Sequence, residues 1–203
     1  QCVEIFMKII TAVGRWWVLP RILQLLTIAL LPKPTGGDRP IGIFPSGIRI
    51  WTKFLQPIYV APWERGEGKR PFFFGEKDKS CEKCVWLQSF NAEYAEAKGL
   101  SYSTALVDLA KAYENVQHHV LVREACELGF PIEVIRLACL LYRMQRRIMI
   151  GATATAQVAT SQTIVAGCSF ATTLLRVVLL KAVDRAMQAW PKAEIYVVVD
   201  DLT

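Results

Sequence analysis

Three carboxylates stand directly behind two apolar runs and could bind divalent cations together. Asp108 follows the run TALV at 104–107, and Asp200 and Asp201 follow the run IYVVV at 195–199. A carboxylate buried beside hydrophobic strands is unfavourable unless it is paired or binds a cation. If the two runs form neighbouring strands, the three carboxylates meet around Mg²⁺, which prefers oxygen ligands and keeps positions open for substrate phosphates. Two such ions can activate a hydroxyl and stabilise a leaving pyrophosphate.

Each acidic site also has a purely structural explanation. Asp108 could cap the helix that follows its strand. Asp200 and Asp201 could form a turn after an edge strand. The presence of both sites in one chain favours metal binding, and the structural explanation of each site stays open.

The elements that must position these carboxylates follow from the pattern of apolar residues and turn formers. A helix is predicted for 81–97, with Gly99 as its C-terminal cap. The other predicted elements are extended segments joined by turns at 31–46, helices at 116–128, 131–143 and 169–189, a β-hairpin at 147–164, and strands at 102–108 and 193–199. This order predicts an α+β fold with helices packed on one face of the sheet.

The apolar stretch 5–31 raises the question of a membrane span. Lys8, Arg15 and Pro20 interrupt it well before about 20 clean apolar residues accumulate. Two short amphipathic helices around Pro20 are therefore predicted, and no membrane partner is expected.

Composition and charge are those of a folded protein with a polyanionic partner. The 203 residues are 53% hydrophobic and 21% charged, which excludes disorder as the default and suits one large domain or two small ones. The net charge of +6 favours nucleic acid or an acidic membrane surface. Because the chain starts at Gln1 and stops just behind Asp201, we expect it to be part of a larger protein.

The cysteine pattern indicates a reducing, intracellular compartment, cytoplasmic or nuclear. Four of the six cysteines lie in apolar helical patterns, where free cysteine behaves as a small hydrophobe. Cys81 and Cys84 form a single C-x-x-C with no second pair at zinc-ligand spacing. Two residues facing the core one helical turn apart are the simpler interpretation. For His118 and His119 a surface or core-edge role is favoured over metal binding.

Four segments, taken in order, are similar to the motifs of one enzyme family. Residues 106–116, LVDLAKAYENV, look like its first catalytic motif, and 197–202, VVVDDL, look like its catalytic Asp pair. Upstream, LLPKP at 30–34 with DRPIGI at 38–43 resembles its fingers motifs, and FFFGEKDKSCEKCV at 72–85 resembles the segment between fingers and palm. The family is the reverse transcriptases of non-LTR retrotransposons and group II introns.

The resemblance covers the chain from about Trp16 to its last residue and implies a right-hand polymerase fold. Fingers and N-terminal helices would occupy 1–100, and a palm with an antiparallel sheet would occupy 101–203. Residues 131–165 could pack with the fingers, and the thumb would be absent. The implied activity is RNA-directed DNA polymerase, a nucleotidyltransferase that uses an RNA template, a primer strand, dNTPs and two Mg²⁺ ions, with Mn²⁺ as an alternative. Other domains of a parent polyprotein are further implied partners.

The same resemblance assigns roles to individual residues. Asp108 and Asp200 would be metal ligands, and Asp201 a supporting carboxylate. Tyr113 would lie under the sugar and exclude a ribose 2′-hydroxyl, with a core aromatic as the alternative.

Basic residues complete the predicted nucleotide and template sites. Lys33 and Arg39 would contact the incoming triphosphate, where Arg offers a fork that matches phosphate, with a solvated basic hairpin as the alternative. Gly167 could let nucleotide or template approach the backbone. Template-backbone contacts could come from Arg49, Lys53, Lys69, Arg70, Lys77, Arg146 and Arg147, for each of which a solvent-facing role is the alternative.

Departures from the family pattern keep two other functions open. The segment 166–172 reads AGCSFAT where the family has Q-G-x-x-x-S-P, Glu114 replaces the usual acid, and Val198 replaces an aromatic residue. These changes support a non-catalytic remnant that binds nucleic acid. A viral-type RNA-dependent RNA polymerase palm is the other alternative, and Tyr113 argues against it. Without primer-gripping strands or a thumb after Thr203, we expect the isolated fragment to polymerise poorly or not at all.

Overall fold

The chain forms two compact units. A computed structural model describes residues 1–34, 36–74, 79–151, 153–199 and 201–202, with the backbone alone for Asp201. Unit 1 comprises Gln1–Gly68 and Tyr113–Val178, and unit 2 comprises Lys69–Ala112 and Leu179–Thr203. These units divide the chain at other positions than the predicted boundary after residue 100, and their equivalence to fingers and palm stays a prediction.

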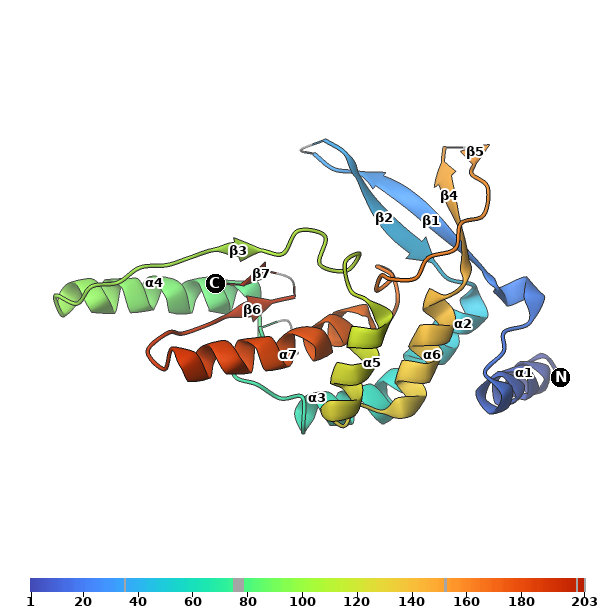
Figure 1. Ribbon diagram of the computed structural model, residues 1–203, viewed down its shortest axis with the longest axis horizontal. Coiled ribbons are helices and arrows are strands. Elements are labelled where there is room, and N and C mark those ends of the chain that lie inside the picture. Colours follow the sequence, from blue (N-terminus) through green and yellow to red (C-terminus); the bar gives the residue numbers. More distant parts are fainter. Residues whose placement is uncertain (35, 75–78, 152, 200, 203) are drawn as a thin grey trace. The chain divides into compact units, whose positions relative to one another are not determined.

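A mixed sheet forms the first layer of unit 1 (Figure 1). Its strands within the described residues are β1 (Leu25–Pro32), β2 (Asp38–Ile43), β4 (Gln145–Ile150) and β5 (Thr153–Ala154), in the order β2-β1-β4-β5. β1 pairs with β2 in the antiparallel sense and with β4 in the parallel sense, and β4 and β5 form a hairpin. The predicted strand-turn-strand and hairpin are confirmed, although both begin earlier than predicted.

Helices supply the other layer of unit 1. They are α1 (Cys2–Trp16), the 3₁₀ turn η1 (Arg21–Leu23), α2 (Ser46–Leu55), the π-helical turn η2 (Gln56–Val60), α3 (Ala61–Arg65), α5 (His118–Glu127), α6 (Ile132–Tyr142) and the start of α7 (Ala171–Ala189). α5 and α6 match the predicted helices and lie side by side in Figure 1. The predicted second helix around Pro20 is wrong, because residues 25–32 form the strand that pairs on both sides.

The core of unit 1 is built from these two layers. Leu26 of β1, Leu121 of α5, Leu141 of α6 and Leu174 of α7 are fully buried. Burial alternates along the first half of β1, as expected for a strand with one face on a core. The α+β class predicted from the sequence is therefore confirmed.

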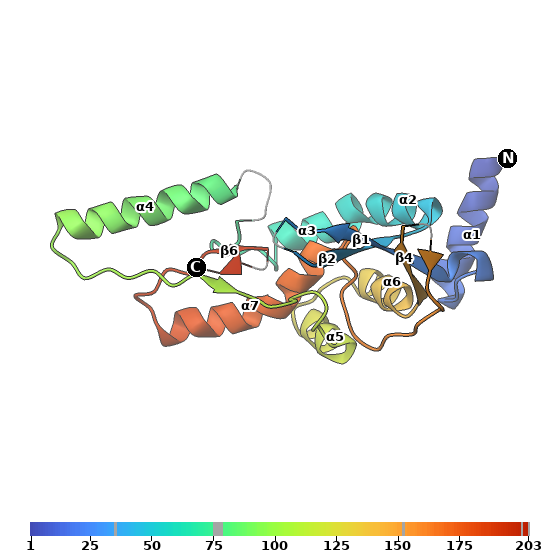
Figure 2. The same cartoon turned by 90° about the horizontal axis from the view of Figure 1, so that it is seen from above.

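Unit 2 contains one long helix and a small antiparallel sheet. Its elements are α4 (Cys81–Ala97), β3 (Val107–Asp108), β6 (Val197–Val198), β7 (Asp201–Leu202) and the end of α7. The sheet order within the described residues is β3-β7-β6. Figure 2 shows α4 and β3 running in opposite directions.

α4 coincides with its prediction, because its ends carry local signals. Ser80 caps its first turn by accepting a hydrogen bond from the Lys83 N–H at 3.2 Å. Gly99 follows the last turn with φ +65°, a conformation that glycine adopts at low cost. Cys84 is buried but Cys81 is exposed, so the prediction that both cysteines face the core is wrong for Cys81.

The predicted strands of unit 2 are much shorter in the structure. β3 pairs with β7, and β7 pairs with β6, so β3 and β6 are not direct neighbours. The chain turns back after Val199, which inserts β7 between them. The other edge of β6 is bonded to the phenylalanine segment 72–74, through Phe74 N–H to Val197 O at 2.8 Å and Val197 N–H to Phe72 O at 2.7 Å.

Among the described residues, no helix has the length and the apolar character needed to cross a membrane.

Candidate functional site

Two acidic positions face each other across the sheet of unit 2. The register pairs Asp108 with Asp201, and Asp201 with Val198. Residues directly opposite in an antiparallel pair lie on the same face of the sheet, with Cβ atoms about 4.5 to 5.5 Å apart. Positions 108 and 201 therefore belong to one cross-strand row. The alternate row consists of Val107, Leu202 and Val197.

Burial differs between the strands of this sheet. Val197 of β6 is fully buried, whereas both residues of β3, Val107 and Asp108, are exposed. The expectation of a buried carboxylate is therefore wrong for Asp108: Leu106 and Val107 before it are 80% and 49% exposed. The feature that needs explanation is the opposition of two acids, since like charges directly opposite destabilise a sheet. A bound cation would offset that repulsion.

The residue type at positions 108 and 201 suits a magnesium site. Mg²⁺ is held in proteins by one or two carboxylates, with its other positions taken by water and substrate phosphates. Asp108 and Asp201 would supply these carboxylates. Among the described residues no group of three His, Cys, Asp or Glu side chains could hold a metal ion. Asp200 and the side chain of Asp201 lie outside that set, so the predicted cluster of three stays a prediction.

The turn between β6 and β7 contains a strained residue that the sequence did not reveal. Val199 has φ +60°. Two-residue hairpin connections require positive φ, which Gly or Asn normally supplies. A β-branched residue in this conformation is an outlier that costs about 1 to 2 kcal/mol. Backbone strain of this kind is concentrated at functional sites, and here it lies between the strand β6 and the acidic pair.

The predicted triphosphate contacts, Lys33 and Arg39, belong to unit 1. Lys33 follows β1, where its N–H donates to Gly37 O at 3.0 Å and its carbonyl accepts from the Gly36 N–H at 3.1 Å. Arg39 lies opposite Leu31 in the β1–β2 register. Both basic side chains are exposed at the tip of this hairpin, as both a phosphate contact and a solvated hairpin require.

Gly167 has a structural role within unit 1. Its φ is +100°, and a Cβ added there would overlap the carbonyl oxygen of Gly42 in β2. The same loop is bonded to β2 through the Gly42 N–H and Ala166 O at 2.7 Å. The missing side chain therefore lets this loop pack onto β2, and the nucleotide contact of Gly167 stays a prediction.

Tyr113 is half-buried at the start of the second stretch of unit 1. Its carbonyl accepts a hydrogen bond from the Ile164 N–H at 2.8 Å. This bond fixes the backbone that carries the ring and leaves both the sugar contact and the core role open.

The predicted template contacts divide into exposed and internally bonded side chains. Arg49, Lys53 and Lys69 are exposed. Arg70 forms a two-pronged ion pair with Asp184 of α7, with its Nε and Nη2 2.9 Å from the two carboxylate oxygens. Arg147 is half-buried, Arg146 is buried, and Lys77 lies outside the described residues. Arg146 thus lacks the surface position that a template contact needs.

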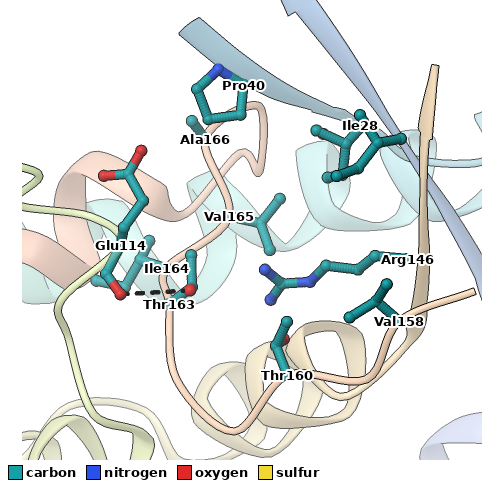
Figure 3. A pocket seen from close by; sticks show the side chains of 12 residues that line it. Ile28, Pro40, Glu114, Arg146, Val158, Thr160, Thr163, Ile164, Val165 and Ala166 are labelled. Atoms are coloured by element: carbon teal, nitrogen blue, oxygen red, sulfur yellow. Dashed lines mark hydrogen bonds between the residues drawn. The ribbon is translucent and has the colours of Figure 1, made fainter. Parts of the chain in front are cut away.

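Arg146 instead faces a pocket of about 210 Å³ in unit 1 (Figure 3). The walls come from β1, β2 and β4 and from the segment 158–166, and Glu114 lies at one side. Nη2 of Arg146 donates to Tyr142 O at 3.2 Å, and burial lowers the pKa of the guanidinium. No sequence pattern pointed to this pocket, because its lining residues are spread over distant segments.

Comparison with known proteins identifies the kind of fold. No protein-family model matches the chain, and no curated protein matches its sequence. Three solved telomerase structures are similar, each over 98% of this chain. They are a Candida tropicalis telomerase truncated from its C-terminal domain (TM-score 0.55, 11% identity), and the C. tropicalis and Candida albicans enzymes with a TWJ fragment of telomeric RNA (0.56 and 0.57, both 12%).

The chain spans 48%, 38% and 40% of the lengths of these telomerase chains. Telomerase is a reverse-transcriptase-related enzyme, so the chain has a reverse-transcriptase-like fold. Identity this low shows the fold alone, and it does not distinguish the enzymes of non-LTR retrotransposons or group II introns from other members.

Proposed function

We propose that this chain is the fingers-and-palm part of a reverse transcriptase of the retroelement kind, which copies RNA into DNA. The observation that carries the proposal is the register that sets Asp108 opposite Asp201, in a chain with a reverse-transcriptase-like fold. Phosphoryl transfer needs little covalent chemistry from the protein and depends on positioning and electrostatics. Two acidic positions opposite each other in a sheet suit that task.

Five of the predicted site residues have a defined part in this reaction. Asp108 and Asp201, with Asp200, would hold the divalent ions. Two bound Mg²⁺ or Mn²⁺ ions would supply the positive charge for attack of a primer 3′-hydroxyl on a dNTP and for release of pyrophosphate. Lys33 and Arg39 would bind the triphosphate, because exposed cations at a hairpin tip can move onto a polyanion.

RNA template, primer strand and dNTPs are the partners that the proposal requires, together with other domains of a parent polyprotein. The net charge of +6 supports a polyanionic partner. Two of the similar telomerases were solved with an RNA fragment. By analogy, we propose RNA as the template of this chain.

Metal binding by the chain itself is the first test. Mn²⁺ titration of the ¹⁵N-labelled chain should broaden the amide signals of Val107, Asp108 and Leu202 before other signals. Asp108→Asn should lower the Mn²⁺ affinity at least about tenfold, since it removes one of very few charged ligands. Asp38→Asn, which removes an exposed acid from β2, is the matched control and should change nothing. Unchanged broadening in Asp108→Asn would contradict the proposal.

Primer extension tests the reaction itself. In a longer protein that contains this chain, Asp108→Asn or Asp200→Asn should abolish DNA synthesis on an RNA template while the folded state is retained. Near-normal extension by either variant would reject the assigned roles.

A non-catalytic nucleic-acid-binding protein is the second candidate. The segment 166–172 lacks the Gln, Ser and Pro of the family, and packing onto Gly42 already accounts for Gly167. This function predicts RNA binding that weakens steeply with salt, without metal-dependent extension by a longer protein. The Mn²⁺ titration and the extension assay together separate the two candidates.

A further inference from the structure

The pocket of unit 1 encloses a buried cation that has no counter-ion among the described residues. Arg146 is 9% exposed, and its Nε is buried without a hydrogen-bond partner in the described part of the chain. None of the ion pairs found among those residues includes it. An arginine stays charged in a protein, and buried charges are normally paired. Figure 3 shows the guanidinium directed into the pocket.

A second polar atom of the pocket wall is also unsatisfied. Oγ1 of Thr160 is buried and has no partner among the described residues. A hydroxyl can donate to or accept from a ligand. Arg146 and Thr160 therefore offer two hydrogen-bond donors from neighbouring walls of one pocket.

Apart from Glu114 and Thr163, the rest of the wall is apolar. Ile28, Ile148, Val158, Ile164 and Val165 line it. An apolar cavity of about 150 Å³ in another protein accepts benzene. The present volume of about 210 Å³ accommodates one ring, or a branched chain of similar size, together with a small polar group.

The loop at the pocket is held in a strained conformation. Thr163 has φ +106°, which is unusual for a β-branched residue. Its N–H donates to Val116 O at 2.8 Å, its Oγ1 donates to Glu114 O at 3.3 Å, and its carbonyl lies 3.0 Å from Nε2 of His118. Strained residues that are over-determined by their surroundings occur at ligand clamps, and these bonds fix the wall in advance of binding.

We propose that this pocket binds a small organic carboxylate, with its apolar body against Ile148, Val158 and Ile164 and its carboxylate accepting from Nε of Arg146 and Oγ1 of Thr160. Charge-assisted hydrogen bonds to a carboxylate are the interactions that satisfy a buried guanidinium best. The proposal does not depend on the polymerase function, because none of its residues has a part in that reaction.

Glu114 allows a second test of the proposal, in which the expected effect on binding is opposite to that of removing Arg146. Its side chain lines the pocket but is directed toward Ala166 rather than toward Arg146 in Figure 3. A carboxylate at the rim repels an anionic ligand. Glu114→Gln should therefore strengthen binding of the anion and leave a neutral ligand unaffected.

Benzoate is the probe, and benzamide is its neutral counterpart of the same shape. With ¹⁵N-arginine labelling, the Nε–H signal that disappears in Arg146→Met should shift when benzoate is added to the wild-type chain. By calorimetry, Arg146→Met should weaken benzoate binding by about 10- to 100-fold, the range for a hydrogen bond to a charged group. Thr160→Val should weaken it by a smaller factor. Arg143→Met, which removes an exposed arginine just before β4, is the matched control and should have no effect.

A second variant tests the pocket with Arg146 in place, because replacing this buried residue could unfold the chain. Ala166→Leu fills the pocket from the side of the loop and should abolish benzoate binding, with the thermal unfolding transition retained. The proposal is overturned if benzoate leaves the Arg146 Nε–H signal unchanged. It is equally overturned if benzamide binds as tightly as benzoate, because the carboxylate charge would then contribute nothing. Competition by inorganic phosphate at equal concentration would also overturn it, because the apolar body would then contribute nothing.

Discussion

Replacing Gly167 by alanine should destabilise unit 1 through two separate effects. A left-handed backbone conformation costs a residue with a side chain about 1 to 2 kcal/mol, and Gly167 has φ +100°. The new Cβ would also overlap the carbonyl oxygen of Gly42, and overpacking of this kind costs about 1 to 3 kcal/mol. The sum is about 2 to 5 kcal/mol, a large part of the roughly 5 to 15 kcal/mol that holds a typical domain folded.

Gly129→Ala separates the two effects. Gly129 follows α5 with φ +60°, and no described atom lies within 4 Å of its Cβ position. This variant should lose only the backbone part, about 1 to 2 kcal/mol. Urea unfolding followed by circular dichroism measures both variants. With an m-value of about 2 kcal/mol/M, the Gly167→Ala midpoint should fall by about 1 to 2.5 M.

The outcome also decides between two roles of Gly167. If Gly167→Ala unfolds at the same urea concentration as Gly129→Ala, the close packing onto Gly42 is refuted. A variant of full stability that had lost nucleotide binding would instead support the role implied by the family resemblance.

Three further predictions address single interactions. Asp184→Asn removes the partner of Arg70. Because both side chains are about 30% exposed, we expect the free energy of unfolding in urea to fall by about 1 kcal/mol, and by less at high salt. An unchanged free energy of unfolding at low salt would refute this prediction. Burial lowers the pKa of His118 below its usual 6.5, so the unfolded state binds the proton more readily and stability should fall as pH decreases through 6.5. His118→Gln should reduce the change of the urea unfolding midpoint between pH 7.5 and 5.5, whereas His119→Gln should not. If the midpoint changes equally with pH in both variants, the assignment to His118 is rejected. Tyr113→Ala in a longer active protein should raise ribonucleotide incorporation, and an unchanged preference for dNTPs would count against its contact with the sugar.

Helices were predicted well because their ends carry local chemistry. α4 has a serine before its first turn and Gly99 after its last, and the structure returns the predicted bounds. Between α5 and α6, Gly129 with φ +60° and Pro131 mark the boundary. Such signals depend on neighbouring residues only, so a sequence displays them directly.

The strands were predicted less well because their partners are distant. The run 25–31 is apolar except for Thr27, a pattern that a buried strand and a buried helix share. The run forms a strand because it pairs with β4, and no local sequence pattern contains that information. β7 was missed for a different reason, since Val199 occupies a turn position where the usual signal is Gly or Asn.

The candidate site was predicted in part. The sequence indicated that the acidic segments at 108 and 200–201 meet, and the register places Asp201 opposite Asp108. It did not indicate that β7 lies between the longer runs or that Asp108 is exposed. The pocket around Arg146 gave no signal at all, because an arginine in a strand looks the same whether it faces solvent or a cavity.

The parallel pairing of β1 with β4 constrains how this protein can be made. Leu25 pairs with Gln145, and the segment Lys69–Ala112 between them belongs to unit 2. A ribosome that adds about 5 to 20 residues per second leaves β1 without this neighbour for roughly 6 to 24 s. The nascent β1–β2 hairpin then presents an unpaired edge to other chains. The sheet of unit 1 should therefore be completed late in folding. Variants that slow this step should aggregate before their folded state becomes unstable.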